Sequence, residues 1–333
     1  MDSKHRIKSL RSSPNYDKGS FQNLRPTPVI SQDVSYIKVL KEVLNRPAGV
    51  KPSKVLPSIQ TNLKSLHSKH PVVVWFGHSS YLIHCQGINI LVDPVFCGYA
   101  SPIPGMVKAF PGSDVYKVED LPEIDFVLIT HDHYDHLDKP TVRKLNPKAF
   151  YTSLGVGNRL EQFSMSGSDI YELDWWESIS VSEDIQLTAT PARHFSGRGL
   201  KRGGSLWSSF VLHIFGYTLF LGGDSGYGDH FKDIGDKYGP FDISILECGQ
   251  YNTSWPLIHM MPEETVQASI DLQAKVLMPV HWGKFALANH LWNEPVARAH
   301  KASLSAGVKI TTPLIGEPVI IDQHYPSKIW WDL

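Results

Sequence analysis

The chain has 333 residues, of which 42% are hydrophobic and 20% charged, and its formal net charge is −1. Its length suits one large domain or two ordinary ones, and its composition excludes a disordered, collagenous or coiled-coil chain. The near-zero charge provides no basic field for nucleic acid, and three cysteines are too few for a disulfide framework. We therefore expect a cytoplasmic protein with a sizeable core and no nucleic-acid partner.

The first 70 residues differ in charge from the rest, because they contain 13 Lys+Arg and 4 Asp+Glu, a balance of +9. Residues 1–30 lack hydrophobic periodicity, which predicts an extended or mobile leader without the apolar segment of a signal peptide. Residues 34–44 have apolar side chains at helical spacing. We expect residues 1–70 to form a leader with one helix, whose cations allow peripheral contact with a membrane.

From residue 71 the chain consists mainly of short apolar runs, and we expect residues 71–333 to form one domain. The predicted strands are 72–76, 81–85, 88–92, 126–130, 149–152, 185–189, 208–214, 218–221, 243–247 and 276–279. The predicted helices are 139–145, 262–273 and 295–306. Strands come first and then alternate with helices, an order that predicts an α+β or layered α/β body.

The segment after the strand predicted at 126–130 is rich in ligand-type side chains. It contains His131, His133, Asp135 and His136 at HxHxDH spacing. In a tight turn, alternate side chains diverge, so that the first two face one metal ion and the last two face a second. Imidazole and carboxylate suit zinc and, less selectively, iron or manganese. The alternative is a polar loop that happens to be histidine-rich, but this spacing directly after an apolar strand favours metal binding.

Three more ligand-type residues end apolar runs later in the chain. His194, Asp224 and His281 each follow a strand-like segment, and active sites of layered sheets gather at strand ends. Each alone would more often be a hydrogen-bonded turn residue. Together they supply the number of ligands that two metal ions require.

These motifs resemble the metallo-β-lactamase-fold hydrolases. The segments Trp75-Phe-Gly-His78, Leu91-Val-Asp93-Pro, His259-Met-Met-Pro-Glu-Glu and His281-Trp-Gly-Lys-Phe resemble in particular the branch with N-acylphosphatidylethanolamine-hydrolysing phospholipase D. The ascorbate-phosphate lactonases are similar but more distant. The resemblance implies an αββα sandwich of two mixed β-sheets with metals at one edge. Lys284 departs from it, since a small polar residue is expected at that position.

The resemblance also implies a binuclear site, with two zinc ions or, alternatively, manganese or iron. It assigns His131, His133 and His194 to one metal, Asp135, His136 and His281 to the other, and Asp224 to both. A metal-bridging hydroxide would then be the nucleophile. Asp135 and Asp224 would balance the positive charge and orient the proton of that nucleophile.

Four residues near these motifs are candidates for roles other than metal binding. His259 precedes a predicted helix and is our candidate for binding a substrate oxygen or protonating the leaving group; the alternative is a capping or surface histidine. Tyr134 faces either the substrate or the wall of the site. Asp93 is expected to orient a ligand from behind, and His78 to line the site, although a turn aspartate and a backbone-satisfying histidine are the alternatives.

The sequence therefore predicts a metal-dependent hydrolase of small-molecule or phospholipid substrates, with phosphodiester cleavage of the phospholipase D type. The alternative is a lactonase or phosphatase acting on a small sugar phosphate or an acyl lactone. A silent metal-binding protein is disfavoured, because all seven ligand positions are occupied. The side chains expected to wall an apolar groove for acyl chains are Trp75, Phe76, Met260, Met261 and Phe285. The oligomeric state stays open.

Overall fold

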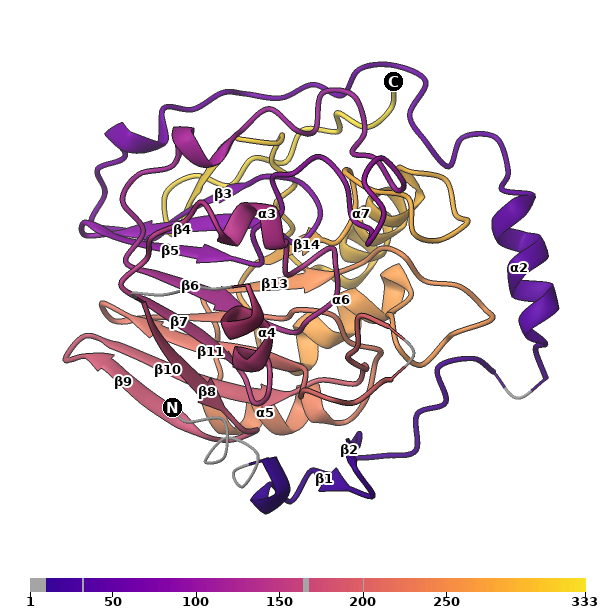
Figure 1. Cartoon of the computed structure of the whole chain (residues 1–333). Helices are drawn as coiled ribbons and strands as arrows, with labels where there is room; N and C mark the ends of the chain where they lie inside the picture. The colour runs from indigo at the N-terminus through magenta and orange to yellow at the C-terminus, as the bar shows by residue number, and fades with distance from the viewer. Residues whose placement is uncertain (1–9, 32, 164–167, 200) are drawn as a thin grey trace.

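The computed structural model describes residues 10–31, 33–163, 168–199 and 201–333, so that residues 1–9 of the predicted leader lie outside it. Two mixed β-sheets lie face to face, and helices cover both outer surfaces (Figure 1). This arrangement confirms the αββα sandwich that the sequence predicted. Within the described ranges, every helix is too short or too polar to cross a lipid bilayer.

The first sheet has seven strands in the order β15-β3-β4-β5-β6-β7-β8. Neighbours are antiparallel from β15 to β5 and parallel from β5 to β8. The strands are β3 (Val72–Trp75), β4 (Tyr81–Cys85), β5 (Ile88–Val92), β6 (Phe126–Ile129), β7 (Ala149–Ser153), β8 (Asp169–Leu173) and β15 (Pro318–Ile320).

Strands β3, β4, β6 and β7 of this sheet are buried on both faces, which explains their continuous apolar runs. Val73 and Trp75 of β3 pack into the core between the two sheets. Val72 and Val74 alternate with them and face an outer core, to which α3 and the segment of α4 also contribute. These two short helices span Lys139–Val142 and Gly157–Gln162.

The second sheet has six strands in the order β14-β13-β12-β11-β10-β9. Strands β12, β13 and β14 are parallel, and the remaining neighbours are antiparallel. Helices α5, α6 and α7 cover its outer face (Figure 1). The bounds are β9 (Ser178–Ser182), β10 (Ile185–Pro191), β11 (Ser208–Ile214), β12 (Tyr217–Leu221), β13 (Ile243–Glu247), β14 (Leu277–Val280), α5 (His230–Tyr238), α6 (Pro262–Asp271) and α7 (Glu294–Ala306).

Several elements were absent from the sequence prediction. Strands β8, β9 and β15 and helices α4 and α5 were missed, as were two 3-10 turns at Leu63–Ser65 and Val118–Asp120. β8, β9 and β15 are sheet edges, and β8 and β9 alternate between exposed and half-buried positions along most of their length. Edge strands are short and polar for protection against unwanted pairing, so their hydrophobic signal is weak.

Part of the described leader packs against the body, which the sequence analysis did not predict. Strands β1 (Tyr16–Asp17) and β2 (Ser20–Phe21) form a small hairpin. Phe21 and Leu10 are buried in a cluster with Trp207, which attaches this otherwise polar segment to the body. Helix α2 (Tyr36–Leu44) confirms the helix predicted at 34–44 and lies to one side of the sandwich (Figure 1).

The topology brings the carboxyl ends of several strands to one edge of the sandwich. The loop after β6 carries His131, and the loops after β12 and β14 carry Asp224 and His281. Parallel neighbours end at the same edge of a sheet, where ligands bind in layered folds. The chain thereby places the predicted ligands of both sheets together.

Candidate metal centre

Two clusters of ligand-type side chains lie side by side at this edge. The ligand atoms of His131, His133, His194 and Asp224 lie within 4.8 Å of one another. The same limit holds for a second group, which consists of His78, Asp135, His136 and His281. The structure therefore brings together all seven predicted metal ligands and adds His78, and a third group within the same limit joins Asp224 and His281 to Glu247 and His259.

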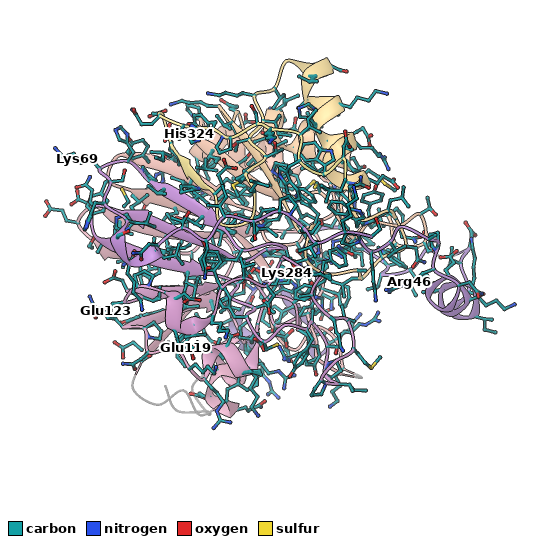
Figure 2. All side chains as sticks on the ribbon, turned by 90° about the horizontal axis from the view of Figure 1, so that it is seen from above. Arg46, Lys69, Glu119, Glu123, Lys284 and His324 are labelled. Atoms are coloured by element: carbon teal, nitrogen blue, oxygen red, sulfur yellow. The ribbon has the colours of Figure 1, made fainter. Side chains whose placement is uncertain are left out.

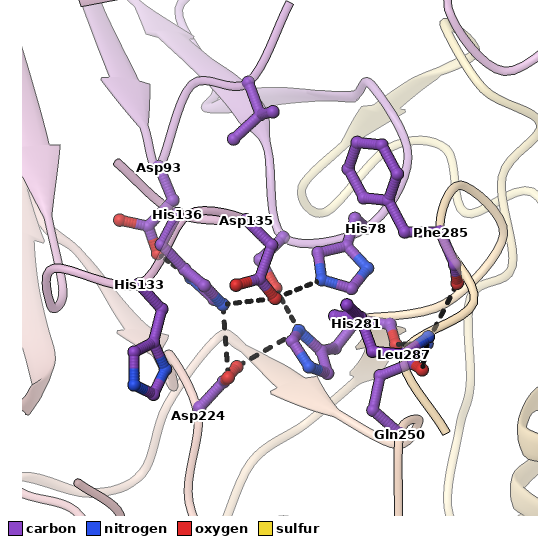
Figure 3. A network of polar contacts seen from close by, with 12 residues as sticks. His78, Asp93, His133, Asp135, His136, Asp224, Gln250, His281, Phe285 and Leu287 are labelled. Carbon is purple, nitrogen blue, oxygen red and sulfur yellow. Dashed lines mark hydrogen bonds and ion pairs between the residues drawn. The ribbon is translucent and has the colours of Figure 1, made fainter. Parts of the chain in front are cut away.

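Asp224 lies between the two groups (Figure 3). Its Oδ2 is 3.1 Å from His136 Nε2, and its Oδ1 is 3.1 Å from His281 Nδ1. Oδ2 also lies 3.7 Å from His194 Nε2 and 3.8 Å from His131 Nε2. One carboxylate thus faces both groups, which is the geometry that the bridging role requires.

The loop after β6 is held in place by the loop after β10. The Arg198 Nη1 donates to the carbonyl oxygens of Asp132, at 3.0 Å, and of Leu137, at 2.5 Å. The Gly197 amide donates to Asp132 Oδ1 at 2.7 Å. Tyr134 is half-buried; its hydroxyl donates to the Arg198 carbonyl at 3.2 Å, and the Arg198 guanidinium lies 3.8 Å from the centre of its ring. The sequence prediction missed Arg198, and a substrate contact by Tyr134 stays a prediction.

Hydrogen bonds from outside the clusters orient the imidazoles. Asp93 accepts from His136 Nδ1 at 2.7 Å and from the Thr130 amide at 2.8 Å, so the other ring nitrogen of His136 faces Asp224. His194 Nδ1 donates to the Ile258 carbonyl at 2.8 Å, which turns Nε2 toward the first cluster. Such contacts set the tautomer and raise the basicity of a ligand. Asp93 therefore lies where the sequence placed an orienting carboxylate.

His78 lies closer to the centre than predicted. Its Nε2 is 2.8 Å from Asp135 Oδ2, and its ring centre is 4.0 Å from that of His281. His78 Nδ1 and His281 Nε2 are buried and make no hydrogen bond within the part of the chain that the structure describes. Buried polar atoms without partners are rare and call for an ion or water. Together with the nitrogen and oxygen donor set, they fit transition-metal ions.

The electrostatics of the clusters favour neutral imidazole, the form that binds metal. Burial lowers the pKa of His131, His194 and His281 well below the ordinary value, and neighbouring imidazoles lower it further. Burial likewise lowers the pKa of His133 to about 4. These four nitrogens are therefore available as ligands at neutral pH.

At His136 the neighbouring carboxylates have the opposite effect and favour the charged imidazole. Burial opposes the charged form of His136, but Asp224, Asp135 and Asp93 together raise its pKa well above the ordinary value. Burial raises the pKa of Asp224 to about 6, against the attraction of His136. A positive charge at the centre is therefore stabilised, whether it is a proton or a metal ion.

Glu247 is a functional candidate that the sequence analysis missed. It ends β13 and is fully buried; it accepts from the amides of Met260, at 3.0 Å, and Ser225, at 3.2 Å. Its other oxygen lies 2.9 Å from His259 Nδ1. The signal was the one used for Asp224, an acidic residue that ends an apolar strand. The His259 ring lies beside both clusters, with centres 5.0 Å from His194 and 5.2 Å from His281.

The predicted walls of an acyl groove are mostly core residues. Trp75, Phe76, Met260 and Phe285 are almost completely buried. Trp75 packs on Trp282 with ring centres 5.3 Å apart, and the other three also lie inside apolar clusters. Buried aromatic side chains contribute to the core before they contribute to a site. The groove prediction is therefore wrong for these four residues.

The partners of Lys284 explain why a lysine stands where a small polar residue was expected. Lys284, labelled near the middle of Figure 2, is almost completely buried, and its Nζ donates to the carbonyls of Val95, at 2.9 Å, and Phe76, at 3.3 Å. The same Nζ lies 3.2 Å from an Asp114 carboxylate oxygen. Lys284 thereby ties the loop that carries His78 to the loop that follows Asp93.

We expect Lys284→Met to lower the free energy of unfolding by about 1–3 kcal/mol, because it leaves two buried carbonyls without their donor. Urea denaturation measures the change. Lys275→Met is the matched control, since Lys275 is exposed and its ion pair with Asp242 is a surface pair. Equal losses in both variants would contradict the structural role of Lys284.

The chain is similar in sequence to known proteins. Residues 88–282 match the family described as "Beta-lactamase superfamily domain". The chain is 39% identical over 332 residues to the uncharacterized protein Rv0906 of Mycobacterium tuberculosis, with 96% of this chain and 88% of that protein covered. It is 31% identical over 252 residues to the N-acyl-phosphatidylethanolamine-hydrolyzing phospholipase D 1 of Caenorhabditis elegans, with 70% of this chain and 69% of that protein covered.

Among solved structures, the metallo hydrolase Igni18 from the archaeon Ignicoccus hospitalis aligns with a TM-score of 0.59 at 20% identity. The alignment covers 76% of this chain and 99% of Igni18, which shows that the two share a fold. The family match, the similar proteins and the two ligand clusters all indicate the same family. The chain belongs to the metallo-β-lactamase superfamily of metal-dependent hydrolases.

Proposed function

We propose that this protein is a binuclear metal-dependent phosphodiesterase that cleaves phospholipid-like diesters at the phospholipase D position. The observation that carries the proposal is the pair of clusters that share Asp224. The similarity to the phospholipase D of Caenorhabditis elegans supports the phosphodiester and the position of cleavage.

The residues that would hold the metals fall into two sets around the shared carboxylate. One set is His131, His133 and His194; the other is Asp135, His136 and His281, beside which His78 lies. Zinc suits this thiolate-free donor set, and manganese or iron is the alternative. Ions of this kind supply Lewis-acid activation of water and stabilise the negative charge that develops on a phosphoryl group.

The side chains of the protein supply orientation, charge balance and a proton. Asp135 and Asp224 offset the positive charge of the centre, and Asp93 keeps the His136 ring in place. Glu247 engages Nδ1 of His259, so that Nε2 of that ring can take up the proton released by the attacking water and pass it to the leaving-group oxygen. Hydrolysis adds water across the bond between phosphorus and the head-group oxygen. The products are a phosphatidic acid and the free head-group alcohol.

The purified protein should contain about two transition-metal ions per chain by elemental analysis. His131→Ala and His136→Ala should each remove one ion preferentially, because the two residues belong to different clusters. His213→Ala serves as the control, since His213 lies on β11 and contacts Thr218. Unchanged metal content in both cluster variants would contradict the ligand assignment.

Asp224→Asn should lower the rate of hydrolysis by about 10²–10³-fold, because the loss of its charge weakens both clusters at once. Thermal unfolding in the presence of metal should change far less than the rate. Steady-state kinetics on a chromogenic phosphodiester measure the effect. Full activity in this variant would rule out the shared role of Asp224.

His259→Ala should lower the rate on a phosphodiester by roughly 10²-fold and leave bound metal unchanged, since His259 supplies a proton in this proposal. The assay compares a phosphodiester, an N-acylphosphatidylethanolamine and a lactone with the same metal-loaded enzyme. Release of phosphatidic acid supports the proposal. Hydrolysis of lactones without any phosphodiester cleavage would favour the lactonase alternative.

A further inference from the structure

A pocket of about 420 Å³ lies between the N-terminal segment and the loop after β10. Its lining includes Arg25, Arg202 and His194, and no acidic residue is part of it within the described ranges. A concave site with two guanidinium groups and without carboxylates suits an anion.

The N-terminal wall of this pocket is fixed to the metal centre. Asn23 Nδ2 donates to the His194 carbonyl at 2.8 Å, and the His194 amide donates to Asn23 Oδ1 at 3.1 Å. The Phe21 amide donates to the Gly203 carbonyl at 2.9 Å. Residues 20–29 therefore form a built wall beside a residue of the first cluster.

One aromatic ring separates the pocket from the metal centre. The centre of the Phe195 ring is 4.7 Å from that of His133 and 5.0 Å from the guanidinium carbon of Arg202. Arg202 and the first cluster therefore lie on either side of one phenyl ring, and His194 belongs both to that cluster and to the pocket lining.

The positive charge of the pocket is poorly compensated. Within the described chain, no carboxylate lies at ion-pair distance from Arg202. Arg25 pairs with Asp229, but their side chains are 74% and 69% exposed, and such surface pairs are weak. Arg193 adds a third guanidinium behind the wall, where its Nε donates to Thr27 Oγ1 at 3.1 Å.

We propose that this pocket binds an anionic group of the substrate, a phosphate or a carboxylate, that is separate from the phosphodiester at the metal centre. The proposal rests on the proposed function for the scissile bond and adds a class of substrate, namely diesters with a second acidic group. The two arginines recognise this group by charge-assisted hydrogen bonds.

Kinetics on matched substrates test the substrate assignment. The probes are ethyl p-nitrophenyl phosphate and its analogues with a 2-carboxyethyl or 2-phosphoethyl group in place of ethyl. The wild-type enzyme should show a KM about 10-fold lower for an acidic analogue, the order of magnitude of one hydrogen bond to a charged group. Arg202→Ala should abolish this preference with kcat and metal content unchanged, and Arg202→Lys should restore part of it.

Lys201→Ala is the matched control, because Lys201 is an exposed neighbour of Arg202 outside the pocket lining. It should keep the preference for the acidic analogues. A wild-type enzyme that cleaves all three diesters with equal KM, or an Arg202→Ala variant that keeps the preference, would overturn the proposal and leave the proposed function intact.

Calorimetric titration of the metal-loaded protein with inorganic phosphate tests the pocket without any turnover. Phosphate binding at the metal centre should persist in Arg202→Ala, whereas the binding event in the pocket should disappear in Arg202→Ala and remain in Lys201→Ala. Identical isotherms for all variants would overturn the pocket as an anion site, even if the enzyme cleaved no phosphodiester. An Arg202-dependent event without preference for acidic diesters would overturn the substrate assignment.

Discussion

The burial of imidazoles and carboxylates at one edge of the sandwich is the constraint on which the rest of this structure depends. Removing such groups from water is costly unless they are paired or bind metal. Here Asp224 lies at the meeting point of two clusters, and burial keeps most of the surrounding imidazoles neutral. The result is a preorganised set of donors whose unfavourable desolvation is offset when a cation is bound.

Such a centre needs a rigid support, and the support comes from residues outside it. Arg198 binds the carbonyls of the loop after β6, while Lys284 joins the loops after β3 and β5. Asp93 reaches His136 from the end of β5. Because each contact joins separate loops, the ligands stay at their positions without a helix or strand beneath every one of them. Contacts of this kind can hold side chains on loops as firmly as side chains on helices or strands are held.

The N-terminal segment is also attached by contacts between distant parts of the chain, and we propose that it helps to bind the substrate. Its polar composition provides little hydrophobic drive, yet Phe21 and Asn23 attach it to the body beside His194. A wall that is attached by a few contacts can bring Arg25 to the pocket beside His194 without altering the sandwich. In our proposals, the metal clusters determine which bond is cleaved, and the N-terminal wall determines which substrates bind. One fold can host many activities, because residues around the site, and not the fold itself, determine the substrate.

The sequence by itself predicted most strands and seven candidate ligands that the fold brings together, because strands buried on both faces require apolar runs and the candidates follow those runs directly. It could not reveal β9 or β15, whose edge positions demand little burial. Only the tertiary structure decided that Glu247 engages His259, that His78 joins a cluster and that Lys284 is buried. These roles depend on contacts between segments far apart in the chain. Their local signal was an ordinary acidic, histidine or lysine residue, and folding alone gave each of them its partner.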